Sequence, residues 1–203
     1  MEGSSQKNKF SPIPLEKKEI NNLNLVQFDG PVHMITDPNE AAEVVNSLHQ
    51  HDIIGFDTES KPVFKKGNYN HVSLMQLATI QEVYLLRINA LGLTQEIRDL
   101  LENQHLSKVG LALQNDLHDL KKLEPFEPSG FIDIQHIMRR EGIKTMGLRK
   151  LCAQLLNFRI SKGAQVSNWE ADTLSEKQIR YAATDAWACL KIYQKLKEMD
   201  IEV

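Results

Sequence analysis

The chain has 203 residues, enough for one domain with a sizeable core and too few to favour two independent domains. Hydrophobic residues make up 41% of it and charged residues 25%, a balance typical of soluble globular proteins rather than of disordered or membrane proteins. The formal net charge of −3 excludes a strong overall basic field, so charge alone does not identify a partner.

The N-terminal region carries no recognisable targeting segment. No apolar run approaches the roughly 20 residues of a membrane-spanning helix, and the polar start lacks the apolar stretch of a secretory signal. We therefore expect a cytoplasmic protein that does not bind membranes. Residues 1–22 are polar and show no sustained hydrophobic period, so we expect a flexible tail there and a single domain over residues 23–203.

The first elements of the domain are short strands followed by a helix. Residues 23–36 predict one or two strands broken at the turn Asp29-Gly30-Pro31. Asp37 then predicts a helix N-cap with Pro38 as the first helical residue.

The next segment predicts three neighbouring strands. Residues 52–59 (DIIGFDTE) begin with an almost continuous apolar run, which is typical of a strand covered on both faces. Two further β-like runs, HVSLMQLATI and EVYLLRI, follow and are joined by a polar turn. We expect these three strands to form a meander.

The second half of the chain is mostly helical. We expect a helix after Thr94, a strand near residues 108–111, a helix over 114–123, a short strand at 131–134, and helices over 134–141 and 147–156. Ser175 predicts the cap of a longer final helix. Strands first and helices later, with some alternation, indicate an α/β layered domain. Cys152 and Cys189 lie in apolar helical patterns, so we expect buried reduced thiols.

Asp57 and Glu59 stand at the end of the predicted buried strand. Because side chains alternate along a strand, both carboxylates point to the same side. Two such charges about 4 Å apart repel by roughly 4 kcal/mol at an effective dielectric near 20, which protonation or a cation must relieve. Carboxylate oxygens suit Mg²⁺, whereas zinc calls for clustered His or Cys ligands.

Two other acidic residues are candidates for the same site. Tyr181 and Asp185 are four residues apart and so share one face of the final helix. Asp116 lies near the start of the helix that follows the strand at 108–111. Taken singly, each has an ordinary alternative: a surface acid beside a core tyrosine, and a first-turn acid favoured by the helix dipole.

Three segments, in this order, carry a resemblance to a known family. GFDTE, KVGLALQNDLHDL and YAATDAWACLKIY resemble the three exonuclease motifs of DEDD-type 3′-5′ exonucleases of the tyrosine subclass, most closely the Werner-type and ribonuclease D branches. VSLMQLA and KGAQVSNWEADTLSEKQI are also similar to the Werner-type pattern. The resemblance covers residues 53 to 196.

The resemblance implies a fold and a mechanism. The expected fold is a ribonuclease H-like three-layer α/β fold with a mixed central sheet flanked by helices. The expected activity is hydrolysis of nucleic acid from its 3′ end with two Mg²⁺ or Mn²⁺ ions. Asp57 would bridge the two ions, Glu59 and Asp185 would hold the ion on the nucleophile side, and Asp116 would reach the other. Tyr181 would orient the attacking water, which suits a phenol with an ordinary pKa near 10.

Substrate contacts are predicted at four positions. Met75 and Gln76 lie on the strand after the first motif and would wedge against terminal bases, with core packing as the open alternative. Lys162 would contact phosphate. His118 stands where Werner-type enzymes often carry an aromatic residue. For Trp169 we favour packing.

The expected partners are DNA or RNA 3′ ends, with DNA favoured, and no small-molecule organic cofactor. A ribonuclease D-like exoribonuclease is the alternative, because nothing in the sequence distinguishes a pocket that admits a 2′-hydroxyl from one that excludes it. A catalytically inactive nucleic-acid-binding module is a third possibility. Any helicase or other nucleic-acid enzyme would be supplied by another chain.

Overall fold

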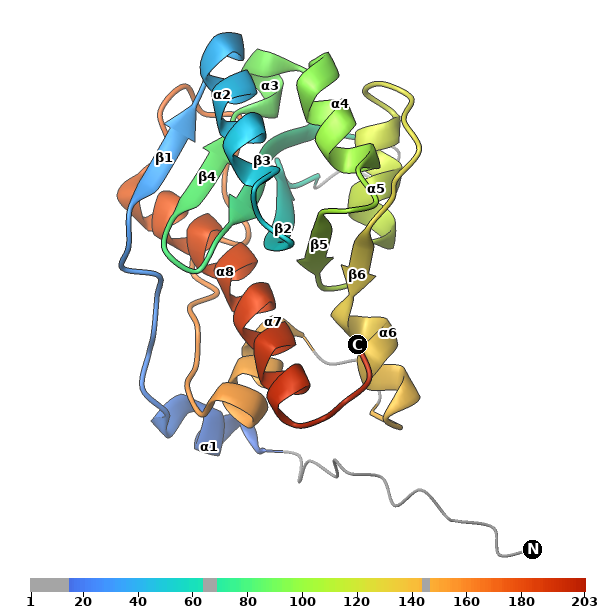
Figure 1. Cartoon of the computed structure of the whole chain (residues 1–203). Coiled ribbons are helices and arrows are strands. Elements are labelled where there is room, and N and C mark those ends of the chain that lie inside the picture. The colour runs from blue at the N-terminus through green and yellow to red at the C-terminus, as the bar shows by residue number, and fades with distance from the viewer. Residues whose placement is uncertain (1–14, 64–68, 144–146) are drawn as a thin grey trace, which may run out of the picture.

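A mixed six-stranded sheet forms the centre of the molecule (Figure 1). The computed structural model describes residues 15–63, 69–143 and 147–203. The strand order is β1-β4-β3-β2-β5-β6, and β3 is antiparallel to both of its neighbours while the other pairs are parallel. The strands are β1 (Val32–Ile35), β2 (Ile53–Ser60), β3 (Val72–Ala78), β4 (Val83–Leu86), β5 (Ser107–Gly110) and β6 (Phe131–Asp133). The predicted meander of β2, β3 and β4 is confirmed.

Helices cover both faces of the sheet, which gives the three layers expected from the sequence. In the described residues they are α1 (Lys17–Asn22), α2 (Pro38–Leu48), α3 (Ile88–Leu91), α4 (Gln95–Glu102), α5 (Gln114–Lys121), α6 (Ile134–Arg140), α7 (Leu148–Leu151), the π-helical turn η1 (Cys152–Leu156) and α8 (Glu176–Glu198). Two start signals are confirmed. The Asp37 side chain accepts hydrogen bonds from the first turn of α2, and Ser175 forms a capping box with Gln178 at α8.

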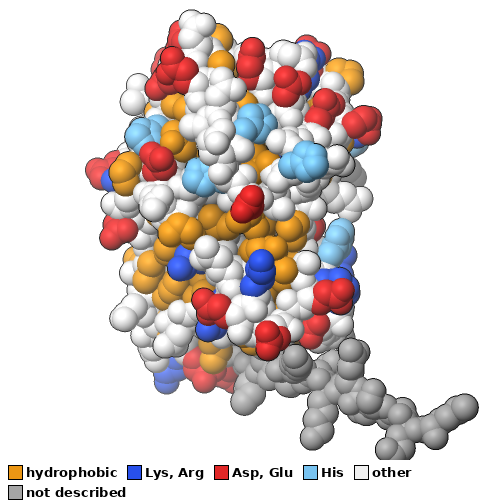
Figure 2. All heavy atoms as spheres, viewed as in Figure 1, with side chains coloured by type: hydrophobic (Ala, Val, Ile, Leu, Met, Phe, Trp, Pro, Cys, Tyr) orange, Lys and Arg blue, Asp and Glu red, His pale blue; other side chains and the backbone are white. Residues whose placement is uncertain are grey.

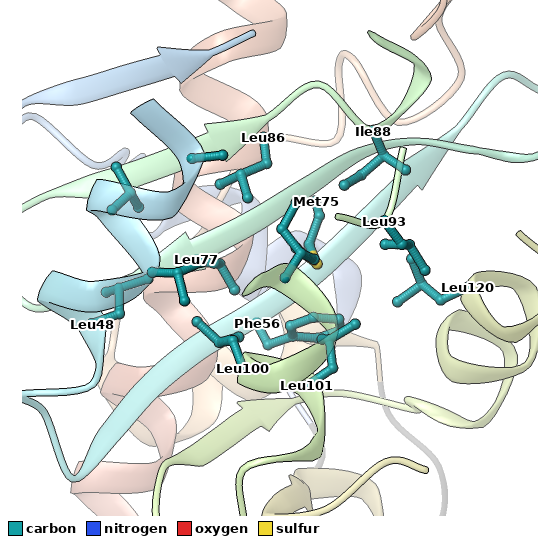
Figure 3. Close-up of a cluster of buried hydrophobic side chains, with 14 of the residues drawn as sticks. Leu48, Phe56, Met75, Leu77, Leu86, Ile88, Leu93, Leu100, Leu101 and Leu120 are labelled. Atoms are coloured by element: carbon teal, nitrogen blue, oxygen red, sulfur yellow. The ribbon is translucent and has the colours of Figure 1, made fainter. Parts of the chain in front are cut away.

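Strand β3 contributes side chains to the hydrophobic clusters on both faces of the sheet. Met75 and Leu77 face α2 and α4, in the cluster drawn in Figure 3 with Phe56. Leu74 and Ala78 face α8 and pack in a second cluster that contains three of its alanines. Every residue of β3 is buried. The sheet therefore positions α8 against one face while the apolar cluster of α2 and α4 holds the other.

A buried lysine links α4 to the sheet. Lys108 on β5 is fully buried, and its Nζ donates to the carbonyl oxygens of Leu100 at 3.2 Å and Asn103 at 2.6 Å. The ammonium also lies 4.9 Å from the centroid of the Phe131 ring. These contacts satisfy the charge and tie the end of α4 to β5.

The segment before β1 is fastened to α8. The backbone N–H of Phe28 donates to the Thr184 hydroxyl at 3.0 Å, and Arg180 donates to the carbonyl oxygens of Phe28 and Gly30. The Phe28 ring is buried, and Leu25 forms a β-bridge with Arg159. We name residues 25–30 the N-terminal strap.

Two local expectations differ from the structure. The predicted tail over residues 1–22 falls in part on residues 1–14, which lie outside the described residues, whereas Lys17–Asn22 form α1 because Ile20 is apolar enough to be buried there. The single helix expected over 147–156 changes after Leu151 into η1, whose wider turn ends at Asn157 in a left-handed conformation.

Within the part of the chain that the structure describes, each helix is too short or too polar to span a bilayer. Acidic and basic side chains are scattered over the face seen in Figure 2, in keeping with the small formal charge of −3. Cys152 and Cys189 are buried free thiols, as expected.

Candidate active site

Strand β2 and helix α8 meet closely at Gly55. A Cβ atom at this position would lie 2.1 Å from the Ala186 carbonyl oxygen and 2.9 Å from the Ala186 carbonyl carbon. Only a residue without a side chain allows the helix backbone to approach the strand so closely. Because Asp57 and Glu59 follow Gly55 at alternate positions, all three lie on the α8 face of β2.

This approach brings the Asp185 carboxylate to the carboxylates of Asp57 and Glu59. One oxygen from each of the three lies within 4.8 Å of the others. Asp185 is only 6% exposed, so it is not the surface acid that the sequence left open as an alternative. The structure thus joins two distant segments of the sequence in one acidic cluster, as expected.

Asp116 reaches the cluster from the other side of β2. The Thr58 hydroxyl, which points away from α8, donates to the Asp116 carboxylate at 2.5 Å. The negative charge of Asp116 is close enough to raise the pKa of both Asp57 and Glu59. Asp116 lies outside the group of three within 4.8 Å, and it still belongs to the same electrostatic site.

Burial shifts the pKa of every acid in this site upward. Burial, reinforced by the neighbouring carboxylates, raises the pKa of Asp57 well above its ordinary value and that of Glu59 to about 9. Burial also raises the pKa of Asp185 to about 7 and that of Asp116 to about 6. Hydrogen bonds from Tyr181 and Thr58 oppose the last two shifts. These carboxyl groups therefore need either protons or a positive charge beside them.

The donor set fits a hard divalent cation. All three clustered ligands offer carboxylate oxygens, which Mg²⁺ and Mn²⁺ prefer. The Asp185 Oδ1 atom is buried and accepts no hydrogen bond from the described residues. A buried carboxylate oxygen of this kind is costly unless a cation or proton meets it.

Tyr181 lies beside Asp185 and keeps its proton. Its hydroxyl is hydrogen-bonded to the Asp185 carboxylate. Burial, together with the negative charges of Asp185 and Glu59, raises the pKa of the phenol above its ordinary value of 10. At neutral pH the phenol therefore keeps its proton, which it donates to Asp185. Its oxygen can accept a hydrogen bond from a water molecule, and the group cannot serve as a base.

The four predicted substrate-contact residues lie in different environments. Lys162 is exposed in the loop before α8, and its charge lowers the pKa of Asp185, which places it beside the cluster. His118 is exposed on α5. Met75 is fully buried on the face away from α8, so core packing, the alternative left open by the sequence, describes it. Gln76 is also fully buried, but it faces α8.

Trp169 packs as favoured from the sequence. Its side chain is fully buried, and its ring centroid lies 6.0 Å from that of Tyr181. The indole thus supports the ring of the tyrosine from the loop that precedes α8.

Two positioning residues were missed by the sequence analysis. One is Thr58, whose place between two acids gave no signal because its side chain points to the opposite face. The other is Asp133, whose carboxylate accepts from the backbone N–H groups of Ala112 and Leu113. Ala112 has φ of 62°, a left-handed conformation that this carboxylate stabilises just before α5 begins. Asp133 therefore sets the direction from which Asp116 enters the site.

Comparison with known proteins gives matches to both sequence and structure. Residues 32–200 match the family model described as a 3′-5′ exonuclease. The bifunctional 3′-5′ exonuclease/ATP-dependent helicase WRN of Mus musculus is 29% identical over 185 residues, which are 86% of this chain and 13% of that protein. Ribonuclease D of Haemophilus influenzae is 32% identical over 184 residues, 89% of this chain and 45% of that protein.

The crystal structure of the Aedes aegypti Nibbler EXO domain has a TM-score of 0.76 and 25% identity to this chain, covering 87% of this chain and 91% of that one. The likeness confirms the ribonuclease H-like fold. This chain spans less than half the length of either curated relative, whereas it covers nearly all of the solved domain.

Proposed function

The chain belongs to the DEDD-type 3′-5′ exonuclease family, and we propose that it removes nucleotides successively from the 3′ end of a nucleic acid with two divalent cations, Mg²⁺ or Mn²⁺. The observation that carries this proposal is the meeting of the Asp57, Glu59 and Asp185 oxygens within 4.8 Å. Asp116, held at the edge of this cluster by Thr58, completes the set of four acids.

The cations, when bound, would stabilise the charge that develops on the attacking and leaving oxygens of the phosphodiester. Asp57, Glu59, Asp116 and Asp185 would hold them. The carboxylates must give up their protons to do so, because ligation uses the ionised form. Metal affinity should therefore rise with pH.

Two side chains act on the substrate and the water. The Tyr181 hydroxyl, whose O–H donates to Asp185 and whose ring is supported by Trp169, can orient the attacking water by accepting a hydrogen bond from it. Lys162 is exposed beside Asp185, where its ammonium suits a phosphate of the bound strand.

We propose DNA as the first substrate, and the similarity to ribonuclease D from Haemophilus influenzae favours RNA as the second candidate. A third outcome is a module that binds nucleic acid without turnover. Matched DNA and RNA oligonucleotides, labelled at the 5′ end, distinguish these when digested with Mg²⁺, with Mn²⁺ and with EDTA.

We expect a ladder of products shortened one nucleotide at a time, and complete inhibition by EDTA. Asp57→Asn should abolish cleavage, whereas the matched control Asp99→Asn, at an exposed position of α4, should cleave normally. Cleavage that persists in EDTA or in Asp57→Asn would refute the metal site. Binding of both oligonucleotides without any release of nucleotide would support the inactive module.

A further inference from the structure

Gln76, at the centre of β3, is an unusual buried residue. Its side chain is fully buried, and neither Nε2 nor Oε1 of its amide makes a hydrogen bond. Buried polar groups nearly always have partners, as Lys108 does through two backbone carbonyls. An amide with a free donor and a free acceptor is costly in the core unless the working protein supplies a partner.

The strand register places Asp57 next to Gln76. Gln76 is paired directly opposite Asp57 in the antiparallel β2–β3 ladder, so the two side chains project from the same face of the sheet. Directly opposite residues have Cβ atoms about 5 Å apart, a separation that a glutamine amide and an aspartate carboxylate bridge with one hydrogen bond.

The helix above this pair is α8, which packs closely on β2 at Gly55. In this region α8 presents Ala182 and Ala186, which are small and fully buried, toward the sheet. Asp185 lies between them in sequence and also has an unbonded buried oxygen, so unsatisfied polar atoms gather at this part of the α8–sheet interface. Since Gln76 is fully buried, it does not reach a substrate strand.

We propose that Gln76 is a positioning residue: its side-chain amide, unbonded in the metal-free protein, donates a hydrogen bond to the ionised Asp57 carboxylate when divalent cations are bound, and it fixes the direction in which Asp57 presents its oxygens to them. Partners of this kind orient a ligand without touching the metal, and their loss typically weakens metal affinity or activity about 10- to 100-fold. The inference rests on the proposed metal site. It replaces the substrate contact predicted for Gln76 from the sequence.

The test uses Gln76→Met, which keeps the length of the side chain and removes the amide. Its matched control is Met75→Leu, at the adjacent position that faces the other core. Calorimetric titration of the metal-free proteins with Mn²⁺ should show affinity about 10- to 100-fold weaker in Gln76→Met and unchanged in Met75→Leu. Thermal unfolding in EDTA should show Gln76→Met at least as stable as wild type, because the variant buries no unpaired amide. On oligonucleotide substrate, kcat should fall while KM stays within about two-fold.

Each other outcome has a distinct meaning. Wild-type Mn²⁺ affinity in Gln76→Met would overturn the proposal, as would a rise in KM with unchanged kcat, which would indicate a substrate contact. Failure of Gln76→Met to fold in EDTA would also overturn it, because the amide would then be structural. Lack of Mn²⁺ binding by the wild-type protein would refute the proposed metal site and, with it, this inference.

Discussion

Replacing Glu59 with Gln should stabilise the metal-free protein while it weakens metal binding. Burial and the charges of Asp185 and Asp116 raise the pKa of Glu59 from 4.5 to about 9. At pH 7 the unfolded chain therefore carries Glu59 ionised, whereas the folded, metal-free protein carries it protonated. Folding must take up a proton, and the free energy of unfolding falls as pH rises from 4.5 toward 9.

The size of the effect follows from the distance between pH 7 and the ordinary pKa. That interval is about 2.5 pH units, each worth about 1.36 kcal/mol, which gives an upper bound of about 3 kcal/mol. Because Glu59 keeps partial exposure, we expect a gain of about 1 to 3 kcal/mol for Glu59→Gln. For a protein of this size each kcal/mol raises the melting temperature by about 2 to 4 °C.

Calorimetric melting in EDTA at pH 7 and pH 5 measures this gain, which should shrink below about 1 kcal/mol at pH 5. Glu43→Gln, at an exposed position of α2, is the matched control and should melt like wild type at both values. With excess Mn²⁺ the order should reverse, because the wild type binds the ion more tightly. A Glu59→Gln protein less stable than wild type at pH 7 in EDTA, or one with equal gains at both pH values, would refute the reasoning.

Three further changes test other parts of the structure. Tyr181→Phe removes the hydroxyl that we propose to orient water, so kcat should fall at least about 10-fold while the Mn²⁺ affinity changes little; an unimpaired rate would exclude the tyrosine from the mechanism. Gly55→Ala places a methyl group against the Ala186 carbonyl and should lower stability to urea by about 1 to 3 kcal/mol, so wild-type stability would contradict the described approach of α8. Burial lowers the pKa of Lys108 to about 8, so the unfolded chain binds more protons between pH 8 and 10.5. The stability of wild type relative to Lys108→Met should accordingly rise by up to about 3 kcal/mol across that window, and a constant difference would show that Lys108 stays charged.

The carboxylates on β2 and α8 could be predicted from the sequence because local patterns decide their placement. Strand alternation put Asp57 and Glu59 on one face, and helical spacing put Tyr181 beside Asp185. The sequence does not show how closely β2 and α8 approach each other. That distance depends on Gly55, whose role is evident only from its contact with the Ala186 backbone.

Other features depend on contacts between distant residues or on small changes of period. The entry of Asp116 depends on the left-handed Ala112 and on the Asp133 carboxylate, and neither residue type signals this. The turn η1 has the same apolar character as an α-helix, and a change of period over five residues is too short to show in the pattern. For Met75 and Gln76, alternation predicts opposite faces, but only the tertiary structure shows which face carries the acids.

The N-terminal strap bears on where this domain can be cut. The family match begins at residue 32, so a fragment trimmed to that point would retain every acid of the site. It would lose Phe28 and Gly30, whose backbone groups bond to the outer side of α8 at Thr184 and Arg180. The helix that carries Tyr181 and Asp185 would then expose a surface that is covered in the intact molecule. A fragment that keeps the contacts between the N-terminal strap and α8 must therefore begin before the sheet, at residue 25.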